Sequence, residues 1–305
     1  MNFIFKISIL FVFCYVKHAT SKCEITAFPP DPKTQCCGQD SATYSKIYSS
    51  EAPAMIDEYP WVALLEHVKD GQAKTLCGGA LISGKYVLTA GHCVTSQTIQ
   101  SVGNIENIIL GEYDTRTEGP DCVIAYSGGE DCTDGVVKIP VEKIIVHPEY
   151  NQKEKKNDIA LIRMTRMAPY TDFISPICLP TEDITQKTGE ITLNKAGWGT
   201  TDGGTRSPVK LQFRVPFIPQ DKCQAAYKIK SAKITLWKGH ICAGGENLTD
   251  FCKGDAGTPL AYGHGRVNEV VGIVSFGPQG CLRNPPIVYT NVYEYLPWIN
   301  SNIVA

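Results

Sequence analysis

Short runs of apolar residues, interrupted by glycine, proline and aspartate, recur from Ile47 to near the end of the chain. Apolar or alternating runs of this length, with turn-forming residues between them, are typical of antiparallel strands. Examples lie at residues 61–65, 80–82, 86–89, 139–146 and 270–275. The pattern predicts an all-β fold, either a sandwich or a barrel.

The two ends of the chain depart from this pattern. Residues 1–21 have a basic start at Lys6, an apolar stretch too short to cross a bilayer, and small residues at its end. They predict a cleaved secretory signal peptide rather than a membrane anchor. Residues 22–46 are polar and rich in turn formers, and we expect a short tethered extension. Near the other end, Tyr295, Trp298 and Ile299 have helical spacing and predict a terminal helix over 293–303.

Composition supports a secreted protein. The 305 residues are 43% hydrophobic and 20% charged, with a net charge of −2. Without the leader, which holds Lys6 and Lys17, 27 Lys and Arg stand against 31 Asp and Glu, a net charge of −4. This balance predicts neither a nucleic-acid partner nor, without a later long apolar stretch, a membrane partner. Leaving out Cys14 leaves an even number of scattered cysteines, which favours a disulfide framework over a zinc site.

Four short motifs follow one another along the predicted β region. They read TAGHC at 89–93, NDIAL at 157–161, AGWG at 196–199 and CKGDAGTPL at 252–260. Histidine, then aspartate, then a Gly-Asp-x-Gly loop is the chain order of chymotrypsin-like proteases. Over about residues 47–303 the chain resembles the trypsin family of serine proteases. Within that family it is most similar to arthropod clip-domain proteases and their inactive relatives, the serine protease homologues.

The resemblance implies two antiparallel six-stranded β-barrels with a C-terminal helix, over residues 47–305. It places His92 and Asp158 in a triad whose nucleophile position holds Ala256. Gly254, Asp255 and the backbone of Ala256 correspond to the oxyanion loop. A methyl group cannot attack a carbonyl, and loss of the serine of such a triad costs on the order of 10⁶ in turnover. The family has glycine at Thr258, where we expect a Cβ to crowd a packed turn.

The resemblance also locates a specificity pocket and an activation site. The pocket positions are Asp250, Phe251, Ser275, Gly277 and Ile287. Asp250 suits a basic side chain, but Phe251 and Ile287 are expected to fill the space above it. Cleavage at Lys46–Ile47 would free an ammonium group for pairing with Asp255, although the serines at 49–50 replace the usual flexible glycines. An incidental protease-sensitive loop at Lys46 is an equally good interpretation.

Twelve cysteines remain after the leader, and the family pattern uses all of them in pairs. The resemblance implies the bonds Cys23–Cys36, Cys37–Cys178, Cys77–Cys93, Cys122–Cys132, Cys223–Cys242 and Cys252–Cys281. A full clip domain has more cysteines than precede residue 47 here, so we expect a remnant of one at most.

Three smaller signals concern modification and metals. Asn247 begins an N-x-T sequon and is a candidate glycosylation site near the pocket. An acidic loop suggests Ca²⁺, but a solvated loop is the simpler interpretation, and we expect no cofactor. The acidic residues are Glu112, Asp114, Glu118, Asp121, Glu130 and Asp131. The histidines lacking metal-ligand spacing, which we expect at the surface, are His67, His147, His240 and His264.

The sequence therefore favours a secreted, catalytically inactive trypsin-like protein that binds extracellular proteases, zymogens or inhibitors. The resemblance implies roles such as a cofactor in prophenoloxidase activation or innate immunity. An active trypsin-like endopeptidase is the alternative if Ala256 is an artefact. A venom or salivary decoy is a third hypothesis, motivated by the reduced clip region.

Overall fold

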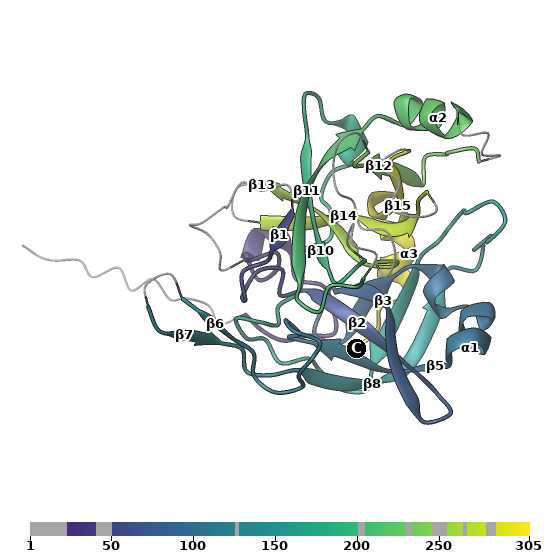
Figure 1. Cartoon of the computed structure of the whole chain (residues 1–305). Coiled ribbons are helices and arrows are strands. Elements are labelled where there is room, and N and C mark those ends of the chain that lie inside the picture. Colours follow the sequence, from purple (N-terminus) through teal and green to yellow (C-terminus); the bar gives the residue numbers. More distant parts are fainter. Residues whose placement is uncertain are drawn as a thin grey trace, which may run out of the picture.

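The computed structural model describes residues 23–40, 51–125, 128–200, 205–229, 234–245, 255–264, 267–278 and 285–305, without the side chains of Glu51 and Ala52. Two β-barrels stack on each other, as Figure 1 shows, with the first barrel below the second in that view. The prediction of two antiparallel six-stranded barrels with a C-terminal helix is confirmed.

The first barrel closes in the order β2-β3-β4-β9-β8-β5. Its strands are β2 (Val62–Lys69), β3 (Gln72–Leu81), β4 (Tyr86–Thr89), β5 (Asn104–Leu110), β8 (Val137–Val146) and β9 (Ala160–Met164). The apolar runs predicted as strands all fall in it or in β14 of the second barrel. Residues of β2 and β4 are buried on both faces in much of their length, because other layers cover the outside of the barrel.

The second barrel has the order β11-β10-β13-β14-β15-β12, and a pairing of β11 with β12 closes it. Its strands are β10 (Thr192–Gly197), β11 (Leu211–Ile218), β12 (His240–Ala243), β13 (Pro259–His264), β14 (Val267–Phe276) and β15 (Ile287–Asn291). A further strand, β1 (Glu51–Pro53), pairs antiparallel with β11. A separate hairpin of β6 (Cys122–Ile124) and β7 (Glu130–Cys132) projects beside the first barrel (Figure 1).

Helices are few and short. They are α1 (Ser96–Val102), α2 (Gln220–Ile229), α3 (Leu296–Asn302) and the 3₁₀ turns η1 (Pro32–Thr34), η2 (Gly91–Val94), η3 (Ile184–Gln186) and η4 (Val292–Tyr295). The predicted terminal helix corresponds to η4 and α3. Ile299 and Ile303 belong to the hydrophobic cluster that fills the first barrel, so α3 fastens the end of the chain to that barrel.

The N-terminal extension packs against the barrels. Cys37 is fully buried. Gly38 N–H donates a hydrogen bond to the Pro176 carbonyl, and the Gly38 carbonyl accepts one from Asn268 N–H. Ala27 is buried in the large hydrophobic cluster. Residues 23–40 thus have a fixed place on the molecule although they form no core of their own.

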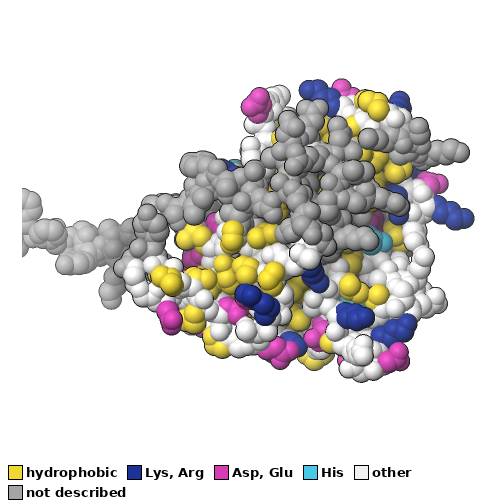
Figure 2. Space-filling view, in the orientation of Figure 1, with side chains coloured by type: hydrophobic (Ala, Val, Ile, Leu, Met, Phe, Trp, Pro, Cys, Tyr) yellow, Lys and Arg dark blue, Asp and Glu magenta, His cyan; other side chains and the backbone are white. Residues whose placement is uncertain are grey.

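Within the described residues, no helix is long and apolar enough to cross a membrane. Lysine, arginine, aspartate and glutamate are interspersed on the described part of the face in Figure 2. Hydrophobic side chains gather on that face toward the β6–β7 hairpin, where Ile124 is 87% exposed.

Candidate active site

A histidine and an aspartate meet at one end of the first barrel. β4 and β9 are antiparallel neighbours, with Thr89 opposite Ala160. His92 lies just after the end of β4 and Asp158 just before the start of β9, so both residues fall at the same barrel end. The imidazole Nδ1 is 2.8 Å from Asp158 Oδ2, and the His92 backbone N–H donates to Oδ1 at 2.7 Å. The aspartate therefore fixes both the ring and the backbone of His92.

The second barrel also holds Asp158. Ser275, on β14, donates its hydroxyl to Asp158 Oδ2 at 2.5 Å. Thr290, on β15, donates to the Asp158 backbone carbonyl at 2.7 Å. The candidate site is thus built at the junction of the two barrels. The sequence analysis placed Ser275 among the pocket positions. Nothing in the sequence indicated that Ser275 or Thr290 donates a hydrogen bond to Asp158.

Asp158 is held in its ionised form. Burial alone would raise its pKa, because only 3% of the residue is exposed. The neighbouring His92 and the hydrogen bonds from His92 and Ser275 outweigh that effect, and the pKa of Asp158 lies below its ordinary value. A carboxylate in this state orients the imidazole and stabilises positive charge on it, as acid–base catalysis requires.

The loop that begins at Asp255 packs near the His92–Asp158 pair. Gly78 N–H donates to the Ala256 carbonyl at 2.9 Å, beside the Cys77–Cys93 bond that adjoins His92. Gly257 has φ +81°, and a Cβ on it would lie 2.3 Å from Thr89 Oγ1, so this turn requires glycine. Ala256 is partly buried against the large hydrophobic cluster and offers only a methyl group. The loop thus packs on Gly78 and on Thr89, at the end of the strand that precedes His92, without a nucleophile at 256.

Thr258 fits this loop without displacing it. The residue is 2% exposed, and its hydroxyl donates to the Asp255 carbonyl at 2.8 Å. Its methyl group occupies space that a Cβ on Gly78 would need, at 2.4 Å. The expected crowding is therefore relieved by the glycine opposite. Because the hydroxyl is used within the loop, Thr258 does not substitute for the missing serine.

The comparisons with known proteins agree with this geometry. The sequence model described as Trypsin matches residues 49–299. The chain belongs to the trypsin family. It is 52% identical over 291 residues to the Phenoloxidase-activating enzyme of Bombyx mori, covering 92% of this chain and 66% of that protein. It is 42% identical over 258 residues to Serine protease ea of Drosophila melanogaster, covering 81% and 65%.

A solved structure shows the same family at the level of the fold. The crystal structure of the Drosophila Grass clip serine protease of the Toll pathway superposes with a TM-score of 0.71 at 35% identity. The match covers 86% of this chain and 73% of the other. This trypsin-family chain spans just under two thirds of the length of the two relatives named above.

Two positions predicted to line the specificity pocket, Ile287 and Gly277, lie close together in the described structure. Ile287 begins β15, is 7% exposed, and packs with the cluster that fills the second barrel. Its Cγ1 would lie 3.4 Å from a Cβ placed on Gly277, so the two pocket positions face each other in contact range.

Several predicted positions lie outside the described residues, namely Asp250, Phe251, Gly254, Asn247, Lys46 and Ile47.

The disulfides tie the extension and the loops to the barrels. Five of the pairs implied by the resemblance are formed, namely Cys23–Cys36, Cys37–Cys178, Cys77–Cys93, Cys122–Cys132 and Cys223–Cys242. Cys252 and Cys281 lie outside the described residues. The described cysteines near acidic or histidine side chains belong to these bonds and are therefore poor metal ligands.

The acidic loop uses its carboxylates internally. Asp121 accepts from the backbone of Asp114 at 2.8 Å, Asp114 pairs with Arg116, and Glu118 pairs with Lys138 at 2.8 Å. Burial, followed by the nearby Asp121, raises the pKa of Glu112 to about 7. Among the described residues, Glu130 is the one carboxylate of this loop that falls in a metal-sized group, and its partners there are the disulfide-bonded Cys122 and Cys132.

Two of the histidines expected at the surface are buried. His67 is 0% and His240 is 3% exposed, so that expectation is wrong for both. His67 contacts the Leu65 carbonyl at 3.3 Å, and His240 contacts the Lys155 carbonyl at 2.6 Å through Nε2. Each histidine lies at a buried position of its strand. A single histidine in a strand does not indicate from the sequence alone whether its position is buried.

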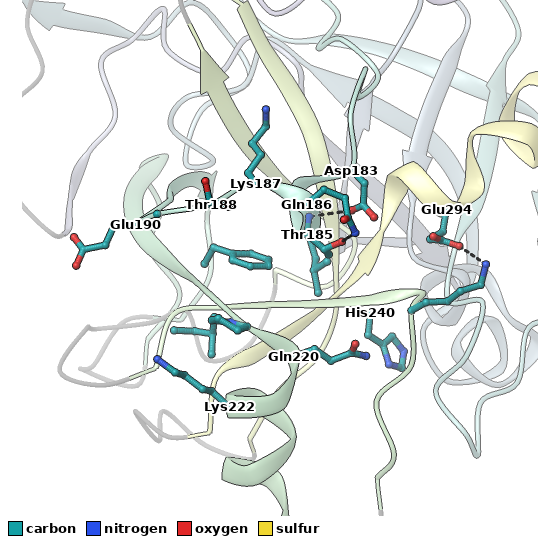
Figure 3. Close-up of a pocket in the computed structure, with 16 residues that line it drawn as sticks. Asp183, Thr185, Gln186, Lys187, Thr188, Glu190, Gln220, Lys222, His240 and Glu294 are labelled. Carbon is teal, nitrogen blue, oxygen red and sulfur yellow. Dashed lines mark hydrogen bonds and ion pairs between the residues drawn. The ribbon is translucent and has the colours of Figure 1, made fainter.

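A second hollow, of about 810 Å³, lies on the second barrel near His240 and is shown in Figure 3. No triad position lines it. Lys238 pairs with Glu294 at its edge, at 2.6 Å, while Lys222 and Glu190 are drawn on the opposite side. The lining carries both charge signs, and this hollow is separate from the candidate active site.

Proposed function

We propose that this chain is a secreted trypsin-family protein that has no peptidase activity and acts by binding other extracellular proteins. The observation that carries the proposal is alanine at 256 in a chain that keeps the hydrogen-bonded His92–Asp158 pair. Removing the nucleophile of such a triad costs on the order of 10⁶ in turnover. That factor corresponds to about 8 kcal/mol of transition-state stabilisation.

The proposed setting is a proteolytic cascade of innate immunity. Relatives of this chain include the Phenoloxidase-activating enzyme of Bombyx mori and, from Drosophila melanogaster, Melanization protease 1 and the Spaetzle-processing enzyme. A chain that keeps the family's fold but lacks its nucleophile is suited to hold a protease, a zymogen or an inhibitor of such a cascade. We infer a cofactor or regulatory role, for example in prophenoloxidase activation.

Secretion is part of the same proposal. The predicted leader at residues 1–21 supports it, and so do disulfides that are characteristic of oxidising compartments. A sequon at Asn247 is compatible with glycosylation on that route.

An assay of ester hydrolysis tests the loss of activity. Purified chain, cut after Lys46, is mixed with arginine and lysine esters, and an active trypsin-family protease cut in the same way serves as the positive control. We expect turnover at the level of buffer alone. Hydrolysis within a few orders of magnitude of the control would exclude a pseudoprotease.

An active endopeptidase is the second candidate, because the His92–Asp158 pair keeps its hydrogen bonds. It requires serine at position 256 in the natural protein. Sequencing the transcript from the source tissue separates the two candidates. A serine codon would favour the active enzyme, and an alanine codon would favour the binding role.

A further inference from the structure

Arg206 lies in the connection between β10 and β11. Thr200 and Arg206 form an antiparallel bridge, and Ser207 N–H donates to the Gly199 carbonyl at 3.1 Å. These contacts fix the backbone on both sides of the arginine. The backbone position from which the Arg206 side chain extends is therefore fixed at the junction of the barrels. Nothing in the sequence pattern predicts this placement.

The guanidinium of Arg206 is held by backbone oxygens of both barrels. Nε donates to the Trp198 carbonyl at 2.9 Å, directly after the end of β10. Nη1 donates to the carbonyl of Thr75, on β3, and lies 3.2 Å from its hydroxyl oxygen. Nη2 is buried and has no hydrogen-bond partner among the residues that the structure describes. The group is thus a fixed, half-buried cation whose Nη2 donor is not used among the described residues.

The carboxylate of Asp255 lies against the same stretch of backbone. Asp255 is 5% exposed, and its Oδ1 is 3.1 Å from the position of a Cβ on Gly197. Gly197 immediately precedes Trp198, the residue that binds Arg206. The cation and the carboxylate therefore contact neighbouring residues of one backbone segment, Trp198 and Gly197. Burial lowers the pKa of Arg206, and the nearby Asp255 carboxylate raises it.

We propose that Arg206 is a positioning residue that supplies positive charge beside the buried Asp255 and so holds the 255–258 loop in place in the uncut chain. A buried carboxylate is costly unless a cation or hydrogen bonds compensate it. In active relatives the resemblance assigns that task to an ammonium group released by cleavage. Here a resident arginine performs it, so the loop keeps its place without cleavage at Lys46. The role is independent of whether Ala256 abolishes catalysis.

A double-mutant cycle on the uncut chain tests the pairing. Arg206→Met, Asp255→Asn and the double variant are compared by their midpoints of urea unfolding. We expect each single change to lower the midpoint and the double variant to fall no further than the worse single variant, because both changes remove the same interaction. Additive shifts would overturn the proposal. Arg166→Met, at an exposed arginine that donates to the Lys138 carbonyl, is the matched control.

A second comparison separates charge from hydrogen bonding. Arg206→Lys keeps the charge, whereas Arg206→Gln keeps hydrogen-bonding capacity without it. We expect the lysine variant to have the higher midpoint, and an equal or lower value would contradict a role for the charge.

Hydrogen exchange keeps the proposal testable if Asp255→Asn fails to fold. Gly257 N–H donates to the Val274 carbonyl and Thr258 N–H to the Asp255 carbonyl, both at 2.9 Å. We expect these two amides to exchange at least tenfold faster in Arg206→Met than in the parent, with no change in Arg166→Met. Unchanged exchange in Arg206→Met would overturn the proposal, and ester hydrolysis by the parent chain would leave it standing.

Discussion

Position 256 carries a methyl group beside a histidine and an aspartate that keep their pairing geometry. The simplest repair is Ala256→Ser, which restores a hydroxyl to the loop folded against His92. We nevertheless expect little hydrolysis of arginine esters by the cut variant, at least 10³-fold below an active relative, because substrate entry is restricted as well. Strong cleavage after arginine by this single variant would contradict the restriction.

Ile287 is the described residue that we expect to restrict entry. It is buried on β15, and its Cγ1 would lie 3.4 Å from a Cβ placed on Gly277. Adding Ile287→Gly to Ala256→Ser is expected to raise ester hydrolysis above that of the single variant, because the pocket gains the volume of a side chain. Equal rates in the two variants would show that Ile287 does not limit entry. Val288→Ala, at the next buried position, controls for general loosening.

Asp158 makes stability depend on acid. Its pKa lies below the ordinary value of about 3.9 for an unfolded chain. The stabilisation is therefore present above that value and is lost as the pH falls through the folded pKa. We expect Asp158→Asn to lower the unfolding free energy by about 2 kcal/mol at pH 7, and by less in strong acid. Urea unfolding of the parent chain and of the variant, at pH 7 and in strong acid, measures this difference in unfolding free energy.

Asp172→Asn, at an exposed position, is the control for the acid dependence. It is expected to change little at either pH, because the side chain is solvated. A deficit for Asp158→Asn that stays constant down to strong acid would mean that its charge does not stabilise the fold.

At the scale of elements, the strands are the part of the fold that the sequence predicts well. Residues 86–89 match β4, and 139–146 fall within β8, because these runs are apolar along most of their length. β3 begins well before the predicted 80–82, since its first half is mostly exposed and holds only two separated apolar residues, Ala73 and Leu76. The closure of the second barrel through β11 and β12 depends on few pairs and has no local signal.

The β6–β7 hairpin should depend on its disulfide more than the molecule does. The two strands pair only with each other, and Cys122 and Cys132 are exposed. An isolated two-stranded hairpin is marginally stable in water. We expect Cys122→Ser with Cys132→Ser to speed proteolysis within this hairpin while shifting the global unfolding midpoint little.

The contrasting disulfide is Cys77–Cys93. Both cysteines are buried, and the bond connects β3 to the turn that carries His92. Replacing this pair by serine is expected to cost about 3 kcal/mol of global stability. Equal global effects of the two double variants, measured by urea unfolding, would contradict the distinction between a local and a global tie.

At the scale of the whole molecule, the site depends on contacts between the two barrels. The sequence predicts that His92 and Asp158 meet, because both motifs flank strands of the family's pattern. It does not predict that Ser275 and Thr290 donate hydrogen bonds to Asp158 from the second barrel. Nor does it predict that Arg206 and Asp255 contact the neighbouring residues Trp198 and Gly197. Isolated polar residues on different strands carry no periodic signal, and only tertiary structure brings them together.

The N-terminal extension should remain attached after cleavage at Lys46. Cys37 is bonded to Cys178, and Gly38 bonds the backbones of Pro176 and Asn268. We expect the cut chain to migrate as one species in non-reducing gels and as two after reduction. With Cys37→Ser and Cys178→Ser, the extension should separate in denaturant without a reductant. Release of the extension from the cut parent chain in denaturant alone would contradict this tether.

Labelling with a fluorophosphonate probe is the sharpest test of whether this chain has an activated nucleophile. The probe reacts covalently with such a nucleophile whatever the substrate preference. The parent chain cut after Lys46 is labelled beside an active trypsin-family protease, and the products are examined by intact mass. The account predicts the control fully labelled and this chain unmodified, since Ala256 offers only a methyl group. A stoichiometric adduct on this chain, at Thr258 or any other residue near His92, would contradict it.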